Sequence, residues 1–511
     1  MPEPTVPIDQ AARDRIVGDL ETTLFVEAGA GTGKTSALVD RIVSLVVSGV
    51  SVEHIAAITF TDRAATELRD RVRRRLEAMA TGKGTEAEAA GRALVELDGA
   101  ALCTLHAFAQ RILVEHPIEA GLPPAVEVMD EVSSLVDFDE RWAGVVDTLL
   151  GDPQHAFTVL VAFELGISLR LLRDMAHRLD DNWDLVDDRL VSTPDPRPID
   201  IGPLLADLRE VVDLREHCTA QADTMLDRLD RVEAIADQLQ EADGNPLSVV
   251  RVLGDRKDVT SRKKVGNKKN WAGSVPIDQV RDQLWSADDR IEAEVQRLND
   301  EVIDRLVEVV GRGAVEAAEK RRRQGQLGFH DLLVLARRVL TESGHGLAVR
   351  AALADHYRCL LLDEFQDTDP LQIELAALIA DPDTVTDDWR RLRPRPGSLF
   401  FVGDPKQSIY GFRRADMAVY LDAREAFGDD AVHLEQNFRT TGPILGWVNA
   451  VFERLIDHRH RKQPEYTPLV PARVDGSTGP PVVLLGTDDS EKLGADDLRA
   501  KSSADVAAAV S

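Results

Sequence analysis

The sequence predicts an α/β fold in which a parallel-sheet lobe is interrupted by a large helical insertion. The first observation is a set of short apolar runs typical of buried strands, at residues 24–26, 55–60, 102–105, 359–362 and 399–402. The second is the helical periodicity that follows the first two runs, because strand–helix–strand order predicts a parallel sheet. The third is the strand-poor stretch that separates the two groups of runs.

The strand-poor stretch is interpreted as a helical insertion. It carries helical patterns at 204–214 and 282–310, and a basic segment at 256–269 that we expect to be a mobile loop. The later strands are expected to resume the first sheet. The predicted segments are a first lobe at 1–125, the insertion at 126–326, the rest of the first lobe at 327–429, and the start of a second lobe at 430–511.

Composition excludes several classes of protein. The 511 residues are 43% hydrophobic and 29% charged, which is typical of a soluble core-forming chain. No apolar run approaches a membrane span and the start is no secretory signal, so we expect no membrane partner and a cytoplasmic location. Three scattered cysteines predict no disulfide framework or zinc site, and Cys103 and Cys359 are expected to be inert core thiols.

The net charge of −28 argues against a protein that coats nucleic acid non-specifically. The objection is limited, because a motor grips DNA along one groove and only that groove has to be basic. Most of the acidity falls on long polar helical stretches, where a solvated surface is the ordinary explanation.

A phosphate-binding loop is predicted between the first strand and its helix. Its residues are Ala28, Gly29, Ala30, Gly31, Thr32, Gly33, Lys34, Thr35 and Ser36. Glycines let backbone N–H groups face phosphate oxygens, and the following helix adds its N-terminal dipole. Lys34 would reach the β- and γ-phosphates of ATP and the Thr35 hydroxyl would hold Mg²⁺. Ala28 stands where the strict pattern has glycine.

A carboxylate pair follows the strand predicted at 359–362. Asp363 would hold Mg²⁺, and Glu364 would polarise the attacking water. A solvated acidic turn is the alternative, and the phosphate-binding loop makes it the weaker one. The 329 residues between Lys34 and Asp363 (363 − 34) are why the middle of the chain has to be an insertion.

Two further segments narrow the function. After the strand at 399–402, Gln407 is placed to sense the γ-phosphate, while Tyr410, Phe412 and Arg413 offer the flat faces and charge that bind unstacked bases. Without context, such aromatics are more often core residues. At the start of the last segment, Arg439 could neutralise charge that develops on the γ-phosphate, although a lone arginine usually forms a surface ion pair.

Together these segments resemble the UvrD/RecB/AddA-like branch of superfamily-one DNA helicases, whose first lobe is RecA-like. Segments 8–13, 58–65, 104–108, 363–369, 403–414 and 436–441 resemble its motifs Q, Ia, Ic, II, III and IV in that order. Segment 325–333 resembles the stretch that leads back from the insertion. The residues around Lys406 and Pro370 resemble the RecB/AddA members of the family more closely than UvrD itself.

The resemblance implies a role for each matching residue. Gln10, with Arg13, would read adenine; Glu364 would be the catalytic base, and Lys34, Gln407 and Arg439 would complete the catalytic set. Single-stranded DNA would lie along Thr59, Phe60, Thr61, Arg63, His106, Phe108, Tyr410, Phe412 and Arg413. The implied activity is 3′-to-5′ movement on DNA in repair or recombination, at single-strand/duplex junctions and in association with the nucleoid, with a possible helicase–nuclease partner subunit.

The chain departs from the family pattern because no motif V or VI is found. We therefore expect an N-terminal portion with an incomplete second lobe, which binds ATP, hydrolyses it poorly and does not unwind DNA alone. The alternative is a non-motor remnant that binds ATP, DNA or a protein partner. A P-loop ATPase unrelated to nucleic acid is disfavoured, since it has no use for the segment from Gln407 to Arg413.

Overall fold

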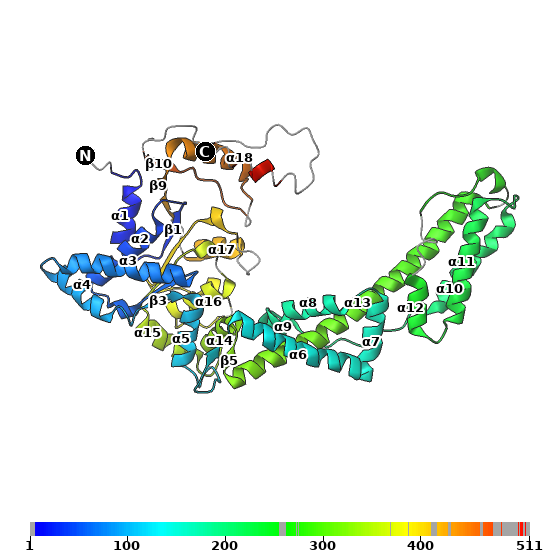
Figure 1. Ribbon diagram of the computed structural model, residues 1–511, viewed down its shortest axis with the longest axis horizontal. Coiled ribbons are helices and arrows are strands. Elements are labelled where there is room, and N and C mark those ends of the chain that lie inside the picture. The colour runs from blue at the N-terminus through cyan, green and yellow to red at the C-terminus, as the bar shows by residue number, and fades with distance from the viewer. Residues whose placement is uncertain are drawn as a thin grey trace. The chain divides into compact units, whose positions relative to one another are not determined.

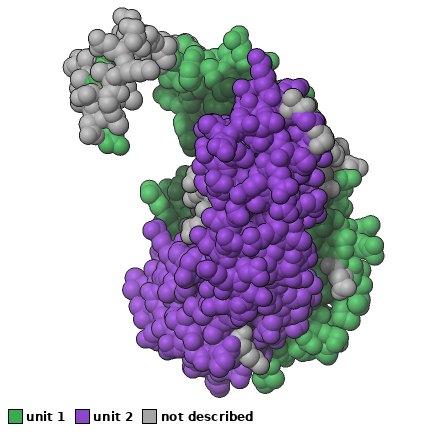
Figure 2. Space-filling view, turned by 90° about the vertical axis from the view of Figure 1, so that its right-hand side faces the viewer, with its two compact units in different colours: residues 1–122, 332–511 green, residues 123–331 purple. Residues whose placement is uncertain are grey.

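The computed structural model describes most of the chain and divides it into two compact units (Figures 1 and 2). The described residues are 6–254, 262–271, 273, 275–367, 369–386, 388–409, 416–427, 431–459 and 463–473, with 482, 499, 501–503 and 506. Unit 1 comprises residues 1–122 and 332–511, and unit 2 comprises residues 123–331. The insertion therefore begins and ends within five residues of the predicted limits.

Among the described residues, unit 1 is built on a six-stranded parallel sheet of order β3-β2-β6-β7-β1-β8. The strands are β1 (Leu24–Ala28), β2 (Ile55–Thr59), β3 (Ala101–Thr104), β6 (Cys359–Leu362), β7 (Leu399–Gly403) and β8 (Ala431–Leu434). All five predicted strands are confirmed, and the strands after the insertion do resume the first sheet. Central strands of a parallel sheet are covered on both faces, which explains their continuous apolar runs.

Side chains of opposite faces pack against different layers. Val26, Phe400 and Val402 join a core with α1 (Gln10–Gly18), α2 (Lys34–Val47), α3 (Asp62–Ala80) and α4 (Thr85–Glu96). On the alternate positions, Phe25 stacks on Phe401 at 4.3 Å between ring centroids. The remaining helices of unit 1 are α5 (Leu105–Glu115), α14 (Phe329–Thr341), which begins at the end of unit 2, α15 (Gly346–His356), α16 (Pro370–Ala380), α17 (Met417–Phe427) and α18 (Gly442–Leu455).

Because every strand is parallel, their carboxyl ends meet at one edge of the sheet. The phosphate-binding loop follows β1, the carboxylate pair follows β6, and the segment with Gln407 follows β7. Ligands of open α/β sheets bind at this edge. The carboxylate strand β6 is separated from β1 by β7.

Unit 2 is helical, as predicted. Its elements are β4 (Glu127–Val128), α6 (Glu131–Gly151), α7 (Pro153–Glu164), α8 (Leu169–Asp180), α9 (Trp183–Arg189), α10 (Ile201–Asp213), α11 (Thr224–Glu241), α12 (Pro246–Gly254), α13 (Ile277–Gln324) and β5 (Gln326–Leu327). The 48-residue α13 carries the core of the unit and ends at Gly325, whose φ of 71° suits a left-handed helix stop. Parallel pairing of β4 with β5 closes the base of the insertion.

The last part of unit 1 corrects one predicted boundary. The second lobe was expected to start at residue 430, but β8 belongs to the first sheet as the neighbour of β1. A new sheet begins only at β9 (Gln436–Thr441), which pairs in parallel with β10 (Val470–Arg473). Sequence position alone could not assign β8, because either sheet accepts a short apolar strand.

Within the described residues, no single helix is long and apolar enough to cross a bilayer. The segments 155–164 and 169–180, which are bent by 117° relative to each other, reach the length and apolar composition of a membrane span only when they are taken together.

Candidate nucleotide-binding site

The loop between β1 and α2 has the geometry of a phosphate cradle. Gly31 and Gly33 adopt φ values of 75° and 93°, a region that side chains rarely enter. The Thr32 hydroxyl donates to the carbonyl of Gly29 at 2.8 Å and closes the turn. Lys34 and Thr35 then occupy the first turn of α2, whose N-terminal N–H groups and dipole favour an anion.

Lys34 and Glu364 meet across β7. Lys34 Nζ lies 2.9 Å from Glu364 Oε2, although the two residues are 330 positions apart. Glu364 has a φ of 51°, which is uncommon outside glycine and marks local backbone strain. Burial works to raise the pKa of Glu364, but the Lys34 ammonium and the hydrogen bonds from Gln366 and Lys34 outweigh it and leave that pKa lowered.

Asp363 is the complementary group of the pair. Its burial, and then the neighbouring Glu364 carboxylate, raise its pKa to about 6. A cation beside Asp363 would stabilise its buried, charged carboxylate. The oxygens of Asp363 and Thr35 therefore fit a divalent ion. Among the described residues, no group of three or more His, Cys, Asp or Glu could hold a metal. A Mg²⁺ ion here would take oxygens of Asp363 and Thr35 together with phosphate oxygens.

Gln366 is a buried link that the sequence analysis missed. Its Nε2 donates to Glu364 Oε2 at 2.8 Å, and its Oε1 accepts the backbone N–H of Asp404 at 2.8 Å. Gln407, predicted to sense the γ-phosphate, donates its amide to Asp404 Oδ2 at 2.6 Å. The carboxylate and the segment after β7 are therefore connected through Gln366 and Asp404. The sequence signal that could have identified Gln366 is its position within segment 363–369, two residues after Glu364.

The side of the site expected to read adenine is organised by Asp9 and Arg13. Arg13 pairs with Asp9 through two hydrogen bonds, donates to the carbonyl of Thr32 at 2.9 Å, and lies 5.1 Å from the ring centroid of Phe438. Gln10 instead donates to Asp14 at 2.7 Å. Phe438 was not singled out from the sequence; the residue is 44% exposed, and its ring offers a flat face beside the loop.

The strand β9 brings Arg439 to the phosphate-binding loop. The N–H of Phe438 donates to the carbonyl of Gly31 at 2.9 Å, and a Cβ added to Gly31 would lie 2.8 Å from Cβ of Arg439. The Arg439 side chain is exposed. The structure thus brings Lys34, Glu364 and Arg439 around one loop.

The residues expected to contact DNA fall into three groups. Thr61 and Arg63 are exposed after β2, and Phe60 and His106 are half-buried at the ends of β2 and β3. Two predictions are corrected: Phe108 is fully buried against Tyr357, and Thr59 is 2% exposed with its hydroxyl bonded to the Thr61 carbonyl. These side chains belong to the core. The third group, Tyr410, Phe412 and Arg413, lies outside the described residues.

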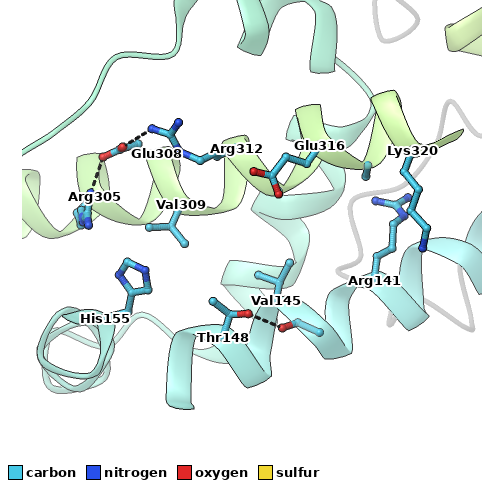
Figure 3. Close-up of a pocket in the computed structure, with 13 residues that line it drawn as sticks. Arg141, Val145, Thr148, His155, Arg305, Glu308, Val309, Arg312, Glu316 and Lys320 are labelled. Atoms are coloured by element: carbon cyan, nitrogen blue, oxygen red, sulfur yellow. Dashed lines mark hydrogen bonds and ion pairs between the residues drawn. The ribbon is translucent and has the colours of Figure 1, made fainter. Parts of the chain in front are cut away.

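A cavity of about 530 Å³ lies in unit 2 rather than at the loop (Figure 3). It is lined by α6, α7 and α13, and Figure 3 shows Arg305 and Arg312 joined to Glu308 by ion pairs. No glycine loop lines it. Further charged side chains line it, including Arg141, Glu316 and Lys320, beside the apolar Val145 and Val309.

Cysteine chemistry plays no part in this site. All three cysteines are free, Cys359 is buried, and burial raises the pKa of Cys103 to about 11. A thiol with a raised pKa is a poor nucleophile, which agrees with the prediction of inert thiols.

Comparison with known proteins places this geometry in a family. The model of the UvrD/REP helicase N-terminal domain matches residues 9–428. The chain is 26% identical over 499 residues to an ATP-dependent helicase/nuclease subunit of Ligilactobacillus salivarius, covering 88% of this chain and 39% of that protein. It is 26% identical over 534 residues to the Levilactobacillus brevis protein of the same description, covering 92% and 40%.

A Staphylococcus aureus protein of that description is 25% identical over 496 residues, which is 85% of this chain and 38% of the relative. The chain thus spans about two fifths of the length of the curated relatives it matches. Because the family model covers most of the sequence, the chain belongs to the UvrD/REP helicase family.

Proposed function

We propose that this member of the UvrD/REP helicase family is the ATP-binding portion of a DNA motor that couples Mg-ATP hydrolysis to movement on single-stranded DNA. The observation that carries the proposal is the meeting of Lys34 with Glu364 at the carboxyl edge of the sheet, beside a glycine loop with left-handed residues. Arg439, on a strand that is bonded to this loop, supports it.

The residues suggest the order of events at the site. Glu364 Oε2 accepts hydrogen bonds from Lys34 and from Gln366, which occupy the oxygen that would take a proton from water. A triphosphate in the loop would compete for Lys34, because phosphate oxygens are strong acceptors for an ammonium. Glu364 would then orient a water and accept its proton, while Arg439 offsets charge on the γ-phosphate. Mg²⁺, held by Asp363 and Thr35, would supply positive charge that offsets the charge of the phosphates.

DNA would cross the exposed ends of β2 and β3 on this proposal. The carboxyl ends of β2 and β3 carry Phe60, Thr61, Arg63 and His106, at the same sheet edge as the nucleotide loop. A change in the bound nucleotide could therefore shift the residues that contact DNA. Movement in the 3′-to-5′ direction, recombination, and action at junctions are proposed from the family resemblance. The description of the relatives as helicase/nuclease subunits supports the existence of a partner protein.

Completion of the second lobe is part of the proposal. Parallel sheets are normally covered on both faces, whereas in the part of the chain that the structure describes the second sheet consists of β9 and β10. On α18, Trp447 is 50% exposed and Leu455 is 67% exposed. Further strands and helices of a longer protein would cover this surface. We propose that lobe closure on ATP, and hence fast hydrolysis, needs them.

The first test is steady-state ATP hydrolysis with and without single-stranded DNA, beside Glu364→Gln and together with titrations of nucleotide and DNA. We expect ATP and DNA binding with slow turnover, which Glu364→Gln abolishes. Turnover strongly stimulated by DNA would show that the chain is a complete motor, against the expected need for more of the second lobe. Absence of ATP binding would contradict the proposed function and favour a non-motor DNA- or protein-binding role.

A further inference from the structure

Asn437 connects the nucleotide loop to the strand that carries Arg439. It is the second residue of β9 and is 2% exposed. Its Nδ2 donates to the carbonyl of Ala30 at 2.5 Å. Its Oδ1 accepts the backbone N–H of Arg439 at 2.9 Å and of Thr440 at 2.7 Å. One amide side chain therefore bonds the loop on one side and the Arg439 backbone on the other.

The surroundings leave this connection little freedom. The neighbouring N–H of Phe438 also donates to a loop carbonyl, that of Gly31, at 2.9 Å. A Cβ added to Gly31 would lie 2.9 Å from Asn437 Nδ2 and 2.8 Å from Arg439 Cβ, so only glycine allows this approach. In a phosphate cradle the N–H groups face the ligand, which leaves carbonyls such as those of Ala30 and Gly31 to hold the strand.

We infer that Asn437 is a positioning residue for nucleotide discrimination: it ties the Arg439 backbone to the phosphate-binding loop, so that Arg439 meets the γ-phosphate. The inference rests on the proposed function, in which ATP occupies that loop. An arginine side chain is long and loses much rotamer freedom when it is fixed. Anchoring its backbone to the loop reduces the disorder that has to be lost when the third phosphate arrives.

The alternative is that Asn437 only stabilises the local turn at Arg439 and Thr440. The amide chemistry of Asn437 distinguishes this local role from the tie to the loop. Acceptance of the N–H groups of Arg439 and Thr440 forms a side-chain turn that aspartate makes equally well. Donation to Ala30 needs the amide N–H₂, which aspartate lacks. Asn437→Asp thus retains the local turn and removes the tie to the loop. Asn437→Ser also retains an acceptor, is too short to reach Ala30, and adds no charge that would itself repel a triphosphate.

The experiment compares affinities for ADP and for an ATP analogue with an uncleavable β–γ bond, by fluorescence displacement with Mg²⁺. The proteins are the wild-type chain, Asn437→Asp, Asn437→Ser, Arg439→Ala and the double variant Asn437→Ser/Arg439→Ala. Asn245→Asp is the matched control, because Asn245 caps a helix in unit 2 through an accepted N–H of Ser248. Melting temperatures without nucleotide establish that each variant is folded.

We expect Arg439→Ala to weaken the analogue roughly tenfold, the usual effect of losing a charge-assisted hydrogen bond, and to leave ADP unchanged. Both Asn437 variants should weaken the analogue selectively, and the double variant should be no weaker than Arg439→Ala. A wild-type ratio of affinities in Asn437→Ser, equal weakening of both nucleotides, or additive effects in the double variant would overturn the inference. No binding by the wild-type chain would instead overturn the proposed function.

Discussion

Buried carboxylates in the P-loop site and in the helical unit are neutralised in different ways. At the site, Asp363 is buried beside a second carboxylate, and its pKa is raised to about 6. In unit 2, Glu308 accepts hydrogen bonds from Thr193, Arg305 and Arg312. Burial works to raise the pKa of Glu308, but these hydrogen bonds lower it to about 2.

The difference separates chemistry from scaffold. A carboxylate with several fixed donors is stabilised as an anion and has nothing further to bind. A carboxylate that is buried with few donors is costly as an anion, and is stabilised when a cation binds beside it. By this criterion Glu308 in unit 2 belongs to the scaffold, whereas Asp363 after β6 has the character of a ligand-binding carboxylate, in keeping with its proposed role at the nucleotide site.

The largest expected effect is on the stability of unit 2. Buried Asp331 accepts two hydrogen bonds from Arg321 and one from the indole of Trp183. Asp331→Ala leaves a buried guanidinium without its main partner, which costs about 3–5 kcal/mol. Urea unfolding monitored by the far-UV circular dichroism of the helices should show this loss, with ATP affinity unchanged. Asp139→Ala, which breaks a surface pair with Arg173, is the control and should cost less than about 1 kcal/mol.

A substitution in the nucleotide loop should have the opposite effect, on ATP affinity rather than on stability. Lys34→Ala should reduce ATP affinity roughly 100-fold, because on the proposed function the ammonium would make charge-assisted contacts with two phosphates. The melting temperature should change little, since the partner Glu364 is still hydrogen-bonded by Gln366. A nucleotide titration measures the effect, and Lys83→Ala, at an exposed lysine of the same unit, is the control. Unchanged affinity would remove the lysine from the site.

The pH dependence of unit 2 sharpens the comparison. The folded pKa of Glu308, about 2, lies below the ordinary value of 4.5, so its stabilisation is present above pH 4.5 and is lost as the pH falls towards 2. Glu308→Gln should destabilise the unit by roughly 2 kcal/mol at pH 7. Its deficit relative to the wild type should shrink across that acidic window. A deficit that stays constant with pH would mean that packing, not charge, explains the loss.

The smallest expected effect is at Gln10. Its bond with Asp14 is an (i, i+4) pair on α1, so Gln10→Ala should change the free energy of unfolding by less than about 0.5 kcal/mol. If Gln10 leaves Asp14 to read adenine, ATP affinity should fall several-fold while GTP affinity does not. Equal loss for both nucleotides would argue against base reading and leave Asp9 and Arg13 as the organisers of this side.

The sequence by itself determined the strands, the insertion and the nucleotide loop, because each has a local physical signature. Buried parallel strands require apolar runs, and a phosphate cradle requires glycines at left-handed positions such as Gly31 and Gly33. Once a phosphate-binding loop is present, a carboxylate pair after an apolar run has few explanations other than a role in the nucleotide site. These features depend on neighbours in sequence, so a single chain displays them.

Only the tertiary structure decided which distant groups meet. The placement of β8 beside β1, the burial of Phe108 and the bond from Asn437 to Ala30 join residues far apart in sequence. Aromatic and amide side chains are equally at home in a core, on a surface or in a site. Their role is fixed by packing and by the available hydrogen-bond partners, which no local pattern specifies.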